Sequence, residues 1–105
     1  MHMRKSFEKK ALAHLKEKFS KQLHDGTDEQ ILIWIRAGIS KASAYRIEIR
    51  RDVLLFLEYW VLLGERFDIN EKYDFINKTL KIRNLHGTEK MRRIQQRSPV
   101  ENLMY

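Results

Sequence analysis

The stretch VLLFLEYWVLL, residues 53–63, constrains the fold more than any other part of the chain. Glu58 is its only charged residue, so a helix formed here is apolar on nearly every side rather than along one stripe. Eleven residues at about 1.5 Å each rise only about 17 Å, whereas the hydrocarbon core of a bilayer is about 30 Å thick. We therefore predict a buried central helix with amphipathic helices packed around it, and no membrane span.

The rest of the composition favours an all-α single domain. One proline and four glycines among 105 residues leave few breaks between helices. The absence of cysteine excludes a disulfide scaffold, thiolate catalysis and cysteine-ligated zinc. No apolar run follows the basic start MHMRKSFEKK, so we see no secretory signal and expect a cytoplasmic location.

Apolar spacing and capping signals predict a compact bundle of four helices, at about residues 4–24, 28–46, 50–64 and 70–84. The second helix has the best-marked start, because Thr27 and Gln30 stand at the two positions of a capping box. A fifth helix is expected at about residues 88–96, and we expect it to be weak because this segment contains few apolar residues. Ser98 and Pro99 end it, so we expect a helical domain over residues 1–97 and a flexible C-terminal tail over residues 98–105.

Gly38 admits two interpretations of the second helix. In the first, the helix continues to about residue 46 and the glycine lets a neighbouring helix approach closely. In the second, Gly38 is the turn of a DNA-binding helix-turn-helix. Trp34 argues against the second, because the motif needs a small residue four positions before its turn glycine. The second interpretation predicts nucleic-acid contacts from Ser40, Lys41, Ser43, Tyr45, Arg46 and Arg50.

Charge is unevenly distributed along the chain, which has a net charge of +7. Residues 1–24 hold seven basic and two acidic groups, and residues 81–97 hold six and one. Residues 25–80 hold eight basic and ten acidic groups. The basic ends could contact an acidic protein surface, nucleic acid or an anionic membrane, or could simply solvate helix faces.

No constellation of residues indicates catalysis or a metal site. The four histidines lack the spacing of a helical metal pair, and there is no nucleophile elbow, phosphate loop or dinucleotide fingerprint. We therefore expect no enzyme activity and no cofactor. Aromatic residues with arginine are common anchors of protein interfaces, while Trp34 and Trp60 are expected to be mostly buried. The predicted protein-binding residues are Arg36, Tyr45, Arg46, Arg50, Arg51 and Tyr59.

A series of short motifs between residues 35 and 68 supplies a family resemblance. They are Gly38-Ile39, Ala42, Tyr45, Arg51-Asp52-Val53, Leu63-Gly64 and Phe67-Asp68. This third of the chain resembles a family of small helical proteins encoded in effector clusters of the bacterial type VI secretion system. The chain departs from the family pattern in having Arg46 where a glycine usually follows the tyrosine. It also has Ile69-Asn70 and Tyr73-Asp74 where Asp-Pro and Pro-Trp pairs are often found.

The resemblance implies a small cytoplasmic accessory protein that acts beside a secreted toxin, effector or spike protein. Its role would be that of a chaperone, an adaptor or a component of the loaded complex, and a homo-oligomer is compatible with it. It favours the long second helix over the helix-turn-helix and supplies no catalytic residues. Two alternatives remain, a nucleic-acid-binding protein and an immunity protein that binds and blocks a cognate toxin.

Overall fold

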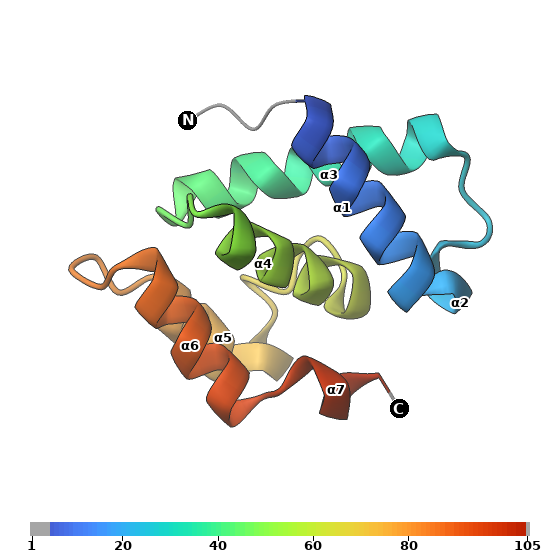
Figure 1. The fold of residues 1–105 in the computed structure, drawn as a ribbon. Helices are drawn as coiled ribbons and strands as arrows, with labels where there is room; N and C mark the ends of the chain where they lie inside the picture. Colours follow the sequence, from blue (N-terminus) through green and yellow to red (C-terminus); the bar gives the residue numbers. More distant parts are fainter. Residues whose placement is uncertain (1–4, 105) are drawn as a thin grey trace.

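Helix α4 (Arg50–Leu63) lies at the centre of the computed structural model, which describes residues 5–104. It contacts α1 (Lys5–Lys18) and α3 (Asp28–Ala44) on one side, and α6 (Gly87–Arg97) on the other (Figure 1). The described residues are all-α with no strand. The predicted fold class and the central position of the apolar helix are both confirmed. No helix within residues 5–104 is long and apolar enough to cross a membrane.

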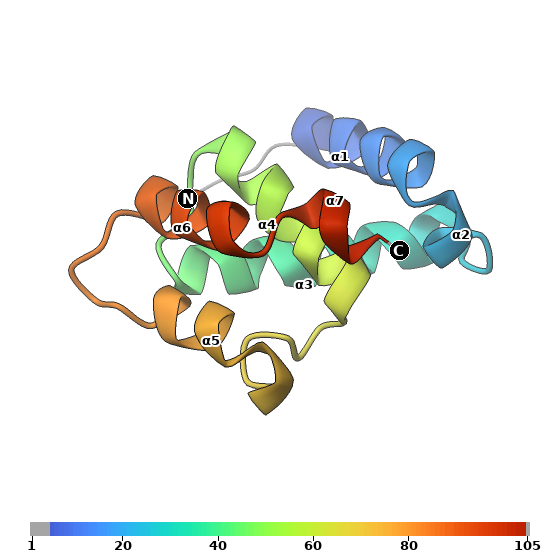
Figure 2. The same ribbon diagram turned by 90° about the horizontal axis from the view of Figure 1, so that it is seen from below.

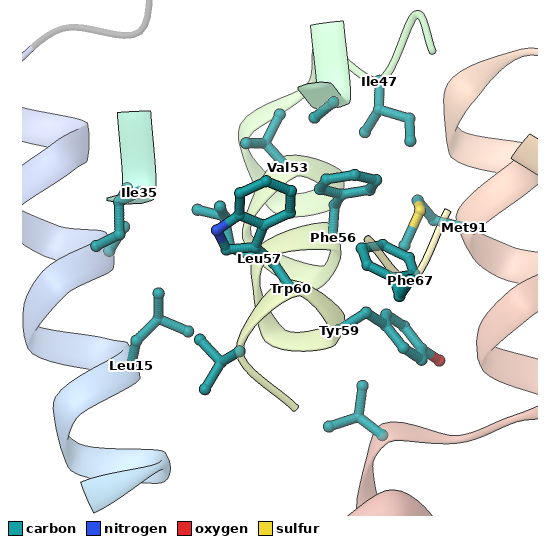
Figure 3. Close-up of a cluster of buried hydrophobic side chains, with 14 of the residues drawn as sticks. Leu15, Ile35, Ile47, Val53, Phe56, Leu57, Tyr59, Trp60, Phe67 and Met91 are labelled. Atoms are coloured by element: carbon teal, nitrogen blue, oxygen red, sulfur yellow. The ribbon is translucent and has the colours of Figure 1, made fainter. Parts of the chain in front are cut away.

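The core forms around α4 because this helix supplies buried side chains in several directions. Val53, Phe56, Leu57 and Tyr59 are fully buried, and Trp60 is 3% exposed. Figure 3 shows Trp60 and Leu57 on the side of α4 that faces α1 and α3, while Tyr59 lies on the side of α6. A helix that is apolar all round has thus been covered on opposite sides by different partners.

The second predicted helix is α3, and it continues through Gly38 without a turn. The capping box is present as predicted, because the Thr27 side chain accepts from the Gln30 N–H and the Gln30 side chain accepts from the Thr27 N–H. Gly38 is buried where α3 meets α4, so the close-approach interpretation is confirmed. The alternative interpretation, a helix-turn-helix with its turn at Gly38, is wrong. Residues 40–44 belong to a continuous helix rather than to a separate recognition helix.

The first predicted helix is divided in two. Helix α1 ends at Lys18, and a short helix α2 (Ser20–Leu23) follows after Phe19, whose backbone has left the helical region at ψ 43°. In a straight helix, apolar residues repeated every four positions drift gradually around the helix surface. The break after Lys18 keeps Phe19, which is 1% exposed, in the core instead. Residue 4, the predicted start, lies outside the described residues.

The fourth predicted helix is shorter than expected. A 3₁₀ turn, η1 (Glu71–Tyr73), leads into α5 (Asp74–Leu80), and residues 81–86 form a loop rather than helix. The Asn70 side chain caps the 3₁₀ turn by accepting from the Lys72 N–H. Ile82, in this loop, is 39% exposed.

The C-terminal region is better ordered than its sequence indicates. Helix α6 buries Met91 and Ile94 and is not a frayed surface segment. Residues 98–104 differ from the predicted flexible tail, because α7 (Val100–Leu103) buries Val100 completely and contacts α4 (Figure 2). The Tyr59 hydroxyl donates to the Ser98 carbonyl at 2.6 Å and so attaches the tail to the core. Tyr105 lies outside the described residues.

Candidate protein-docking surface

The first two turns of α4 have one face that no other helix fully covers. Arg50 and Arg51 are exposed, and Leu54 and Leu55 are half-buried. Arg50 and Leu54 are four residues apart, as are Arg51 and Leu55, so each pair lies on one side of the helix, about one turn apart. We call these four residues the α4 face.

Two adjoining hollows flank the α4 face. The first, of about 230 Å³, lies between α4 and α1, and the second, of about 470 Å³, lies between α4 and α6. Arg51 lines both hollows, so they meet on α4. The α1 side is lined by Ser6, Phe7, Lys10 and Ala11, and the α6 side by Thr88, Met91, Arg92, Gln95 and Gln96.

The rim of this surface is basic because the two basic segments of the sequence, residues 1–24 and 81–97, contribute the helices on either side of α4. Lys10 comes from α1 and Arg92 from α6, with Arg50 and Arg51 between them. Glu89 pairs with Arg92 and Arg93, and these hydrogen bonds lower the pKa of Glu89 to about 2. The guanidinium of Arg92 is thereby partly neutralised, so Lys10, Arg50 and Arg51 carry most of the positive charge.

Asp52 is the one carboxylate that lines either hollow among the described residues, and its own contacts occupy it. It is 5% exposed, and its Oδ2 accepts from the Thr88 hydroxyl at 2.5 Å. The Arg51 guanidinium lies 3.8 Å from its Oδ1. Asp52 therefore offsets part of the positive charge at the start of α4 and links α4 to α6 by a hydrogen bond, without making the surface acidic.

The predicted protein-binding residues do not form one surface. Arg50 and Arg51 lie on the α4 face, whereas Arg36 lines neither hollow and its Nε donates to Glu8 at 2.9 Å. The prediction that Tyr59 is a contact residue is wrong. Its side chain is fully buried, its hydroxyl is hydrogen-bonded to the C-terminal segment, and burial raises its pKa.

Tyr45 and Arg46 follow the end of α3 and line neither hollow beside the α4 face. The half-buried Tyr45 donates its hydroxyl hydrogen to Asp68 Oδ2 at 2.5 Å. Burial is the main cause that raises the pKa of Tyr45, and this hydrogen bond is the second cause. Lys41 also pairs with Asp68, at 3.2 Å, so Tyr45 and Lys41 hold the Phe67-Asp68 connector against α3. Of the other residues assigned to nucleic acid, Ser40 and Arg46 are exposed and Ser43 is half-buried.

The two tryptophans are buried to different extents. Trp60 is 3% exposed, as predicted, but Trp34 is only half-buried, with its ring centroid 5.6 Å from that of Trp60. Sequence reasoning missed Leu54 and Leu55 as surface residues, because nothing in an apolar run tells which leucine is covered. It also missed Lys10 and Arg92 as single residues, although it identified the basic segments to which they belong.

Within residues 5–104, no group of three or more His, Asp or Glu side chains could hold a metal ion. Comparisons with protein-family models, with curated proteins and with solved structures found no match. The fold and this surface therefore define an all-α protein with an apolar depression between two basic helices.

Proposed function

We propose that this chain is a non-enzymatic, protein-binding accessory protein of a type VI secretion effector module. It acts as a chaperone, an adaptor or a component of the loaded complex, and its partner is a secreted toxin, effector or spike protein. The observation that carries the proposal is the α4 face, where half-exposed leucines form the floor of two adjoining hollows with basic residues at their rim.

The chemistry of this surface specifies the docked segment. Leu54 and Leu55, half-buried where the two hollows adjoin α4, offer apolar contacts on a concave surface, which suits the apolar stripe of an amphipathic helix. Lys10, Arg50 and Arg51 favour acidic residues beside that stripe, and such charges raise the association rate at low salt. The partner segment is therefore an acidic amphipathic helix.

The type VI context rests on the family resemblance, which includes part of the docking surface. The Arg51-Asp52-Val53 motif lies in the first turn of α4, where Arg51 lines both hollows and Asp52 accepts a hydrogen bond from Thr88 of α6. The Leu63-Gly64 motif ends the same helix, with Gly64 at φ 93°. The resemblance thus covers the central helix and the residues that orient its exposed face.

Co-expression with the products of the genes on either side of this one tests the proposal. One of those products should co-purify as a stoichiometric complex, and its affinity can then be measured by calorimetry. Reversing the rim charges with Arg50→Glu and Arg51→Glu should weaken binding at least about tenfold, and Leu55→Asp should do the same. A matched control, Lys21→Glu with Arg66→Glu, makes the same change in net charge outside both hollows and should leave affinity within about twofold.

Three outcomes contradict the proposal. The first is that neither neighbouring product binds, or that the rim variant and the control weaken binding equally. The second is that the chain abolishes the toxin's activity in the purified complex, which identifies an immunity protein. The third is micromolar binding to duplex DNA that falls steeply with salt, which identifies a nucleic-acid-binding protein.

A further inference from the structure

A second concave feature lies where the ends of α3 and α5 meet α6. It is a cleft of about 550 Å³, and it shares no lining residue with the hollows beside the α4 face. Four of its lining residues are cationic, Arg46, Lys81, Arg83 and Lys90, and we call it the basic cleft after them. The other lining residues are Ala44, Tyr45 and Leu80, and none is acidic.

Lys90 is the buried member of the cleft, with 3% of its surface exposed. Its ammonium group donates to the carbonyl oxygens of Tyr45, at 2.9 Å, and Leu80, at 2.7 Å. These carbonyls stand at the C-terminal ends of α3 and α5, where the helix dipoles favour a cation. An ammonium group has three donors, so these two bonds leave one hydrogen available. Burial, and secondarily the charge of Arg46, lowers the pKa of Lys90.

The other three cations are exposed, and no carboxylate within residues 5–104 pairs with any of the four. Arg46, which lines the cleft, takes φ 63°, in the left-handed region that favours glycine, and so carries some conformational cost. Lys81 follows the last turn of α5, and Arg83 lies in the loop before α6. Like charges that line one cleft repel one another, and an anion between them would relieve the repulsion.

The surroundings limit the size of that anion. A neighbouring hollow of about 510 Å³ shares Arg46 and Arg83 with the basic cleft, but it is also lined by Glu48. A long polyanion that continued from the cleft along this hollow would meet the Glu48 carboxylate. A compact anion confined to the cleft would not.

We propose that the basic cleft is a binding site for the phosphate or pyrophosphate group of a small phosphorylated ligand. A phosphate dianion accepts several charge-assisted hydrogen bonds at once, which suits two guanidinium groups and two ammonium groups better than one carboxylate does. The site is separate from the α4 face and goes beyond the proposed docking function, so either can fail without the other.

Calorimetric titration of the full chain with pyrophosphate, at neutral pH and about 0.15 M salt, tests the site. We expect saturable binding of one pyrophosphate with a dissociation constant below about 1 mM, and a rise in the thermal midpoint of unfolding with ligand concentration. The double variant Lys81→Gln with Arg83→Gln should weaken binding at least about tenfold. Its control, Lys9→Gln with Lys21→Gln, removes the same charge from α1 and α2 and should leave binding within about twofold.

Backbone amide shifts on titration show where the ligand binds, independently of any variant that fails to fold. Residues 44–46 and 80–90 should shift most, and Arg50, Arg51 and Leu55 on the α4 face should not. The proposal is overturned by an absence of saturable binding or by equal weakening in the control. It is equally overturned if citrate binds more tightly than pyrophosphate, or if a DNA oligonucleotide binds and pyrophosphate does not.

Discussion

Gly38 of α3 packs directly against Leu57 of α4, and a β-carbon at residue 38 would lie 2.6 Å from Leu57 Cδ2. The same β-carbon would lie 3.1 Å from the indole ring of Trp60. Leu57 is fully buried and Trp60 nearly so, which leaves neither side chain free to move away. The contact explains why a long amphipathic helix contains a glycine at its middle.

Gly38→Ala should therefore destabilise the protein even though alanine favours the helix. The helix gains about 1 kcal/mol in propensity, while an extra methyl group in a packed core costs about 1–3 kcal/mol. We expect a net loss of about 1 kcal/mol in the free energy of unfolding, measured by urea denaturation. Ser40→Ala, at an exposed position of α3, is the control and should be neutral or slightly stabilising. An increase in stability for Gly38→Ala would refute the packing role.

Glu58 should contribute to stability by joining α4 to α1. It is 6% exposed, and its two carboxylate oxygens lie 2.6 Å from His14 Nε2 and 3.0 Å from Lys18 Nζ. Glu58→Gln removes the charge from this pair of contacts and should lower the free energy of unfolding by about 1–3 kcal/mol. The exposed Glu17→Gln on α1 should change it by less than about 0.5 kcal/mol. Equal urea midpoints for the two variants would contradict this prediction.

Two tyrosines should make the protein sensitive to alkali. Folding raises the pKa of both Tyr45 and Tyr59 above the ordinary value of 10.0. Their stabilisation is therefore present in full below pH 10 and is lost as pH rises above it, because the unfolded chain then ionises first. Each group makes the free energy of unfolding fall by up to about 1.4 kcal/mol per pH unit.

The variants Tyr45→Phe and Tyr59→Phe isolate these contributions. Each variant is expected to be less stable than the wild type at pH 8, because it lacks a hydroxyl hydrogen bond. Between pH 10 and 11 that difference should shrink, since the wild type alone loses the contribution of the missing tyrosine. Lys90 titrates in all three proteins and cancels from the comparison. A difference in urea stability that stays constant from pH 8 to 11 would show that the pKa values are not raised.

Arg46 should carry a conformational cost that glycine would remove. Its φ of 63° is unfavourable for a residue with a β-carbon by about 1–2 kcal/mol, part of which is offset by the greater freedom of glycine in the unfolded chain. Arg46→Gly should therefore be more stable than Arg46→Ala by about 0.5–1 kcal/mol in urea denaturation, and both should bind pyrophosphate weakly. If Arg46→Ala is the more stable variant, the left-handed conformation is not retained in solution.

Val100 should hold the C-terminal segment against α4. Because its side chain is fully buried, Val100→Asp places a charge in the core and should lower the free energy of unfolding by about 3 kcal/mol. The exposed Asn102→Asp, in the same short helix, should change it by less than about 0.5 kcal/mol. Equal stability of the two variants would restore the prediction of a flexible tail.

Much of the candidate site could not be read from the sequence, for a physical reason that Tyr45 and Tyr59 illustrate. Tyr45 follows the last residue of α3 and Tyr59 lies within the apolar α4, and the sequence alone predicts that both face a partner. Tyr59 is buried because α6 and the segment around Ser98 pack over it, and Tyr45 is held by Asp68. In the sequence Lys90 is one of several cationic residues in a basic segment, yet its ammonium group binds carbonyl oxygens at the ends of two helices.

By itself the sequence determined what depends on neighbours along the chain. Those features are the all-α class, the apolar central helix and the capping box at Thr27. Gly38 admitted two interpretations from the sequence, and its contact with α4 distinguishes them. Only the tertiary structure decided which sides of α4 are covered. It also placed the two basic segments on either side of α4. It gathered four cations into one cleft, one from the segment after α3, two from the loop after α5 and one from α6. Helix formation follows from local spacing and capping, whereas burial and charge clustering depend on which helices pack together.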